Sequence, residues 1–141
     1  MASFPTNFLW GSSTNAQQFE GGRNEGGVGI SIADVRVIPG YEDADFSGFN
    51  GEQRVHDQNR MKFLRDHIQW MAKAVDDGVE MVGYCTWAAI DLYSTREDFG
   101  KRYGFVYIDA DHEFKRIKKD SFHWYKKVIA SNGADLADVE A

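Results

Sequence analysis

The chain has 141 residues, of which 43% are hydrophobic and 27% are charged, and its net charge is −6 at pH 7. This length and composition fit one globular domain with a hydrophobic core. The negative charge argues against a general nucleic-acid-binding protein, because neutralising phosphates requires a basic surface.

The first residues carry no sign of secretion. Residues 1–11, MASFPTNFLWG, lack the basic segment and the long apolar run of a signal peptide. We therefore expect a cytoplasmic protein that does not interact with a membrane. The single cysteine, Cys85, excludes a disulfide or zinc framework within one chain. Its position inside an apolar run predicts a buried thiol.

The N-terminal third alternates between an apolar cluster and polar, glycine-rich sequence. Residues 8–10 predict a short buried strand, and polar Gln18 and Glu20 follow soon after it. Residues 21–29 are rich in glycine and predict a loop. Residues 39–53 are acidic and aperiodic, which predicts a linker and the boundary between two parts of the chain.

Residues 57–76 give the clearest helical pattern. Asp57 is expected to cap the helix and Gly78 to end it. Apolar residues spaced three and four apart predict a buried face: Met61, Leu64, Ile68, Met71 and Val75. A second stripe follows the same spacing: Phe63, His67, Trp70 and Ala74. It indicates either ordinary partial exposure or a contact with another subunit, and His67 is expected to be a packed or surface histidine.

A strand and a polar loop follow this helix. Residues 79–87 form an apolar run that is too short to span a membrane and has the length of a buried strand. Polar residues delivered at the C-terminal end of a parallel strand are where α/β folds place ligands. Ser94, Lys101 and Tyr103 together could bind a phosphate through two hydroxyl donors and one ammonium. A solvated polar loop explains the same residues equally well.

The C-terminal part predicts an extended segment and a helix. Residues 103–109 alternate as a short strand does, whereas the basic run at 115–119 is expected to be a solvated face. Residues 121–131 predict a helix that Ser121 caps and that ends at Asn132-Gly133. Its inward residues are expected to be Phe122, Tyr125, Val128 and Ile129. Residues 134–141 form an acidic tail, expected to fray.

Four motifs resemble glycoside hydrolase family 1, the β-glucosidase and 6-phospho-β-glucosidase family. They are FLWG, AQQFEG, DGVEMVGYCTW and GKRYGFVYID, and they occur in the family's order. Residues 1–38 resemble the N-terminus of the family, and residues 54–133 resemble its C-terminus. Residues 39–53 would then join the two where the middle of the family is missing, within a single domain covering 1–141.

The resemblance implies roles for five residues. Gln18 matches the glutamine that hydrogen-bonds sugar hydroxyls, and Trp87 matches the tryptophan that lines the sugar pocket. Ser94, Lys101 and Tyr103 match the three residues that bind the 6-phosphate in the phospho-glycosidase branch. The family needs no metal or organic cofactor, so none is expected here. The ligand implied is a sugar phosphate.

The sequence departs from the family at the catalytic carboxylates. A retaining glycosidase uses two carboxylates about 5–5.5 Å apart, which the family carries in Asn-Glu-Pro and Glu-Asn-Gly motifs. Neither motif occurs in the 141 residues. The other carboxylates near the expected pocket are not expected to be catalytic: Glu20, Asp91, Glu97 and Asp98. We therefore expect a truncated family protein that is inactive or very weakly active on β-glucosides.

The implied fold is α/β, a partial (β/α)₈ barrel. It keeps about a quarter of the barrel, namely the first strand, 8–12, the last strand, 79–87, and the last two helices. Strands with open edges need cover, so self-association is expected, with a tetramer favoured and a dimer as the alternative. Two other interpretations stay open: a sugar-phosphate or anion-binding module, and a glycosidase whose active site is rebuilt between subunits.

Overall fold

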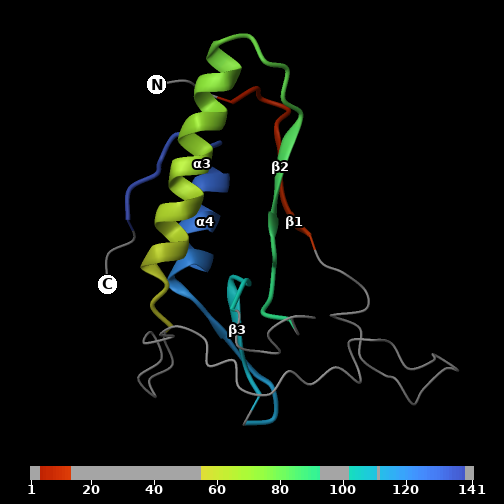
Figure 1. The fold of residues 1–141 in the computed structure, drawn as a ribbon, viewed down its shortest axis with the longest axis vertical. Coiled ribbons are helices and arrows are strands. Elements are labelled where there is room, and N and C mark those ends of the chain that lie inside the picture. The colour runs from red at the N-terminus through yellow and green to blue at the C-terminus, as the bar shows by residue number, and fades with distance from the viewer. Residues whose placement is uncertain (1–3, 14–54, 93–101, 111, 139–141) are drawn as a thin grey trace, which may run out of the picture.

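The computed structural model describes residues 4–13, 55–92, 102–110 and 112–138. In this part of the chain, α3 and α4 lie on one side of a parallel pair of strands, β1 and β2, and a second pair, β3 and β4, lies at the end nearest the start of α3 (Figure 1). The elements in chain order are β1 (Leu9–Ser13), α3 (Gln58–Asp76), β2 (Gly83–Trp87), β3 (Val106–Asp109), β4 (Lys115–Lys118) and α4 (Asp120–Ala130).

Helix α3 confirms the predicted helix and its buried face. Met61, Leu64 and Ile68 are buried, and the other two residues of the predicted face pack against the same core. The helix ends at Asp76, and Gly78 follows its C-cap with a φ of 92°. The Gly78 N–H donates to the Val75 carbonyl at 3.0 Å, and the next N–H donates to the Ala74 carbonyl at 2.9 Å. These bonds satisfy carbonyls that the helix end would otherwise leave unpaired.

Asp57, the predicted cap of α3, accepts hydrogen bonds from the first turn of α4 instead. Within the described residues, the Asp57 side chain makes no cap bond to α3. Its Oδ1 accepts from the Ser121 backbone N–H at 2.8 Å, and its Oδ2 accepts from the Ser121 hydroxyl. The predicted capping role of Ser121 is therefore also wrong: α4 begins one residue earlier, after Lys119. Asp57 thus satisfies a free first-turn N–H of a helix far away in the sequence.

Helix α4 buries the predicted face only in part: Phe122 packs against the core as expected. Tyr125 and Val128 are buried as expected, but Trp124 is fully buried and Ile129 is 42% exposed. The Trp124 indole N–H donates to the Leu136 carbonyl at 3.3 Å, so its polar atom has a partner in the core. The inward stripe is therefore centred on Trp124 and Val128, which are four residues apart.

The chain end of α4 is tied to the N-terminal segment. Asn132, with φ 49°, and Gly133, with φ 81°, end the helix as predicted. The Asn132 amide donates to the Phe4 carbonyl at 2.8 Å and accepts from the Trp10 indole at 2.9 Å. The Phe4, Phe8 and Trp10 rings pack on one another in the core with centroids 4.6–5.1 Å apart.

The first and last strands of the implied partial barrel pair with each other in parallel. β1 pairs with β2 in a register that runs from Leu9↔Gly83 to Ser13↔Trp87. The last strand is shorter than predicted, because residues 79–82 precede it. Trp10 and Tyr84 face the helices, whereas Leu9 and Cys85 point to the opposite face and are exposed. The predicted burial of Cys85 is wrong because the helices cover only one face of this pair.

The C-terminal basic run forms a strand that was not predicted. β4 pairs antiparallel with β3, so the predicted strand at 103–109 is confirmed only for its second half. Ile117 on β4 is buried, and Lys119, which follows it, is fully buried. The expectation of a solvated face therefore holds for the outward residues of β4 only. The described strands form two separate two-stranded sheets rather than a closed barrel.

Two glycines allow a test of how the helix ends contribute to stability. An alanine Cβ at Gly133 would lie 2.6 Å from the buried Phe4 ring, whereas one at Gly78 would meet nothing within 4 Å. Both residues have positive φ, so each substitution costs about 1–2 kcal/mol of backbone strain. We expect Gly78→Ala to lower the free energy of unfolding by that amount, and Gly133→Ala to lower it by about 1–3 kcal/mol more through overpacking. Urea unfolding curves measure both values, and equal losses would contradict the described packing.

Candidate functional site

The structure brings together the two predicted site residues that it describes. Gln18, Ser94 and Lys101 lie outside the described residues, so their predicted roles are not tested. Trp87 is the last residue of β2, and the backbone next to it bonds to Tyr103: the Ala88 N–H donates to the Tyr103 carbonyl at 3.1 Å. The segment that contains Tyr103 therefore runs beside the C-terminal end of β2.

The C-terminal ends of β1 and β2 meet at the same edge. The Ser12 hydroxyl donates to the Thr86 carbonyl at 2.8 Å, and the Thr86 hydroxyl donates to the Ser12 hydroxyl at 3.3 Å. These short polar side chains join the strand ends. Trp87 emerges at this edge with 40% of its surface exposed. The edge matches the position at which parallel α/β folds bind ligands.

Arg60 of α3 supports the strand end from the helix side. Its Nη2 donates to the Trp87 carbonyl at 3.2 Å, and its guanidinium lies 4.5 Å from the centroid of the Phe105 ring. Burial lowers the pKa of Arg60, and the carboxylates of Asp57 and Asp91 oppose that shift. A partly buried cation thus links helix α3 to the residue at the end of β2.

A buried ion pair holds the backbone on both sides of Tyr103. Asp91 Oδ1 accepts from the Lys119 Nζ at 2.8 Å and from the Gly104 N–H at 2.8 Å. Lys119 Nζ also donates to the Arg102 carbonyl at 2.9 Å. Both side chains of the pair are 0% exposed. Burial lowers the pKa of Lys119, and the Asp91 carboxylate opposes that shift.

Sequence reasoning missed this pair. The sequence position of Asp91 could have indicated its burial, because it ends an apolar run and a buried carboxylate needs a partner. Nothing in the sequence indicated the burial of Lys119, because it is the last of a run of basic residues and the other basic residues of that run are exposed. Among the described residues, no group of His, Cys, Asp or Glu could hold a metal ion. No described helix is long and apolar enough to cross a membrane.

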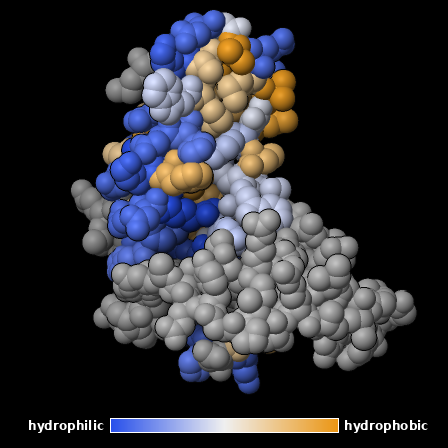
Figure 2. Space-filling view, viewed as in Figure 1, coloured by the Kyte–Doolittle hydropathy of each residue, from blue (hydrophilic) through white to orange (hydrophobic). Residues whose placement is uncertain are grey.

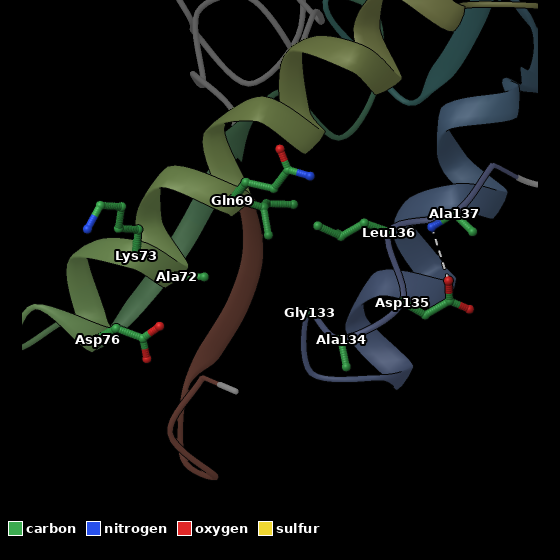
Figure 3. Close-up of a pocket in the computed structure, with 10 residues that line it drawn as sticks. Gln69, Ala72, Lys73, Asp76, Gly133, Ala134, Asp135, Leu136 and Ala137 are labelled. Atoms are coloured by element: carbon green, nitrogen blue, oxygen red, sulfur yellow. Dashed lines mark hydrogen bonds between the residues drawn. The ribbon is translucent and has the colours of Figure 1, made fainter. Parts of the chain in front are cut away.

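One groove among the described residues lies away from the strand ends. Figure 3 shows it between α3 and the segment after α4, with Leu136 pointing toward α3 and the Ala137 N–H donating to Asp135. Its volume is about 730 Å³, and neither Trp87 nor Tyr103 lines it. A smaller groove of about 370 Å³ lies along α4 and β1, between Ser12 and Ile129. In the described part of the chain, the predicted site is therefore one wall at a strand edge rather than an enclosed pocket.

A parallel strand pair with helices on one face and polar residues at the strand ends is an arrangement found in α/β folds, (β/α)₈ barrels among them. The profile of Glycosyl hydrolase family 1 matches residues 1–47 and 40–134. The chain therefore belongs to glycosyl hydrolase family 1, which confirms the resemblance found in the sequence.

The relatives match this chain over a small part of their own length. The 6-phospho-beta-glucosidase of Clostridium longisporum is 48% identical over 92 residues, which is 62% of this chain and 20% of that protein. An aryl-phospho-beta-D-glucosidase of Bacillus subtilis is 38% identical over 121 residues, 77% of this chain and 25% of that protein. A Thermotoga maritima family 1 glycoside hydrolase, solved with a cyclophellitol analogue, gives a TM-score of 0.58 at 41% identity, covering 62% of this chain and 19% of its own.

The exposure of Trp87 predicts that it contributes little to folding. Trp124→Ala removes a fully buried indole and should lower the free energy of unfolding by about 3–5 kcal/mol. Trp87→Ala should cost less than about half of that, because much of the ring is already in water. Urea unfolding followed by far-UV circular dichroism measures both. Equal losses would show that Trp87 is a core residue and would argue against a ligand-binding role.

Proposed function

We propose that this chain is a truncated family 1 protein that binds a sugar phosphate at the ends of β1 and β2 and hydrolyses β-glucosides weakly or not at all. The observation that most supports the proposal is the hydrogen bond from the Ala88 N–H to the Tyr103 carbonyl, because it joins the backbone next to Trp87 to that of Tyr103. The relatives named above as phospho-glucosidases support the phosphorylated ligand.

The proposed ligand contacts use complementary chemistry. The exposed Trp87 indole offers a flat apolar surface for a sugar ring, and Gln18 offers an amide for sugar hydroxyls. Lys101 supplies a positive charge for the phosphate, while Ser94 and Tyr103 supply hydroxyl donors. Arg102, next to Tyr103, is already engaged with the Ile108 carbonyl at 3.0 Å and with the Tyr107 ring.

The proposed lack of hydrolysis rests on the carboxylates. The motifs that carry the family's acid/base and nucleophile are missing from the sequence. Asp91 is the carboxylate at this edge within the described residues, and it is buried and bonded to Lys119 and Gly104. It therefore cannot reach a sugar as a nucleophile. Without a second carboxylate about 5–5.5 Å from a first, the retaining mechanism has no pair to work with.

Ligand binding tests this proposal directly. Glucose 6-phosphate should shift the NMR signals of Trp87 and Tyr103, whereas glucose at the same concentration should shift them far less. Lys101→Ala should weaken binding by about tenfold or more, since a charge-assisted contact to phosphate is lost. Lys62→Ala serves as the control, because Lys62 is an exposed lysine on α3 that pairs with Asp66. An aryl β-glucoside 6-phosphate should be hydrolysed at the background rate. Rapid hydrolysis would instead favour an active site rebuilt between subunits.

Self-association is the second part of the proposal. In the described part of the chain, β1 and β2 pair only with each other, so each has an outer edge without a strand partner. Exposed apolar residues gather over the end of α3 and the segment that leads into β2 (Figure 2), where Val79 and Val82 lie. On α3, Phe63 and Trp70 of the second stripe are also exposed. Open edges and apolar patches of this kind mark interfaces.

The oligomeric state can be measured by light scattering across a dilution series. We expect a discrete multimer, with four chains favoured because each supplies two parallel strands, and a dimer as the alternative. Leu9→Lys should dissociate an assembly built through the sheet, whereas Trp70→Lys should dissociate one built through α3. A stable folded monomer at micromolar concentration would contradict both arrangements.

A further inference from the structure

We propose that the buried Lys119–Asp91 pair positions the phosphate-binding segment, by fixing the backbone of residues 102–104 against the end of β2. The inference rests on the proposed function for its ligand, a phosphate monoester, but the positioning itself is a property of the protein without ligand. Neither residue of the pair is expected to touch the ligand, since both side chains are fully buried.

The pair binds the segment on both sides of Tyr103. Lys119 Nζ donates to the carbonyl of the residue before it, Arg102, at 2.9 Å. Asp91 Oδ1 accepts from the N–H of the residue after it, Gly104, at 2.8 Å. The carbonyl of Tyr103 itself accepts from the Ala88 N–H. Each of three consecutive residues, 102–104, therefore has a backbone group in a hydrogen bond. These bonds fix the backbone position from which the Tyr103 side chain extends.

Energetics favour a positioning role over a stabilising one. A buried ion pair often contributes no more stability than apolar residues of the same volume. A backbone segment without regular pairing, however, needs both a donor and an acceptor when it is buried. Lys119 supplies the donor for the Arg102 carbonyl, and Asp91 supplies the acceptor for the Gly104 N–H. Apolar replacements could fill the space but could not hold these two backbone groups.

The close packing at Gly104 fixes the same segment independently. A Cβ at Gly104 would lie 2.1 Å from the Asp91 nitrogen and 2.1 Å from the Ile90 carbonyl carbon. Only glycine therefore allows the segment to approach residues 90–91 this closely. Lys119 is anchored in turn, because its N–H donates to the Phe105 carbonyl at 3.0 Å. The pair and the glycine therefore both hold the segment close to residues 90–91.

The test uses a charge-neutral double variant, Asp91→Asn with Lys119→Met. It keeps an acceptor for Gly104, removes the donor for Arg102 and leaves no unpaired charge within the pair itself. It also removes the carboxylate that lies 3.9 Å from the Arg102 guanidinium. Hydrogen exchange in the protein without ligand should show faster exchange of the Ala88 amide, while the Ile68 amide in α3 stays protected. The dissociation constant for glucose 6-phosphate should rise by about tenfold, the effect of losing one charge-assisted contact. Val128→Ala is the control: it loosens the core without touching the segment.

The outcomes separate the two proposals. Unchanged exchange at Ala88 in the double variant would overturn the positioning role, whatever the ligand does. Faster exchange with unchanged affinity for glucose 6-phosphate would overturn the link between the pair and the phosphate. If Val128→Ala weakens binding as much as the double variant, general loosening explains the effect and the inference fails. If the unmodified protein does not bind glucose 6-phosphate, the proposed function fails, and the Ala88 exchange rate still decides the positioning role. Should the double variant fail to fold, Asp91→Asn alone, which removes the ion pair and keeps an acceptor for Gly104, provides the comparison.

Discussion

The parallel ladder between β1 and β2 is the constraint on which the rest of the structure depends. It joins residues 74 positions apart in the sequence, such as Ser12 and Thr86. Because the register is fixed from Leu9↔Gly83 onward, the helix-facing side of the pair receives Trp10 and Tyr84. The two helices cover that side, and the strand ends meet at the edge where the candidate site lies.

Polar contacts between distant segments decide how the helices sit on this ladder. Asp57 precedes α3 but satisfies the first turn of α4, so the two helix starts are joined. Arg60 joins α3 to the end of β2, and Asn132 joins the end of α4 to the N-terminal segment. Buried polar groups need partners, and here those partners come from other elements. The same groups that satisfy the backbone therefore also orient the elements.

Local signals explain which parts of the fold could be predicted from the sequence. Helix α3 combines a long apolar stripe with a terminal glycine, so its limits and buried face were predicted correctly. The pairing of β1 with β2 came from the family resemblance, since periodicity alone says nothing about partners. The antiparallel pair of β3 and β4 was not predicted, because β4 is short and its one buried apolar residue, Ile117, lies among basic residues. The inward face of α4 was misjudged because Trp124 and Ile129 both fit a helical stripe.

Only those residues of the candidate site that belong to a family motif could be predicted from the sequence. Trp87 and Tyr103 were named from motifs, and the structure places their backbones side by side. The supporting residues, Lys119, Asp91 and Arg60, were not assigned these roles, because a buried charge depends on partners that the sequence places far away. The predicted roles of Gln18, Ser94 and Lys101 stay predictions.

The long sequence separation between β1 and β2 has a consequence for how the chain tolerates insertions and deletions. Closing a flexible loop costs entropy that grows only with the logarithm of its length, so doubling the length costs about 0.6 kcal/mol. An insertion between two paired strands therefore adds little thermodynamic cost, provided that the ladder register is kept. Two ends of a barrel that are neighbours in space can thus be joined by linkers of many lengths. The geometry of the ladder, rather than the length of the linker, is what such a change must preserve.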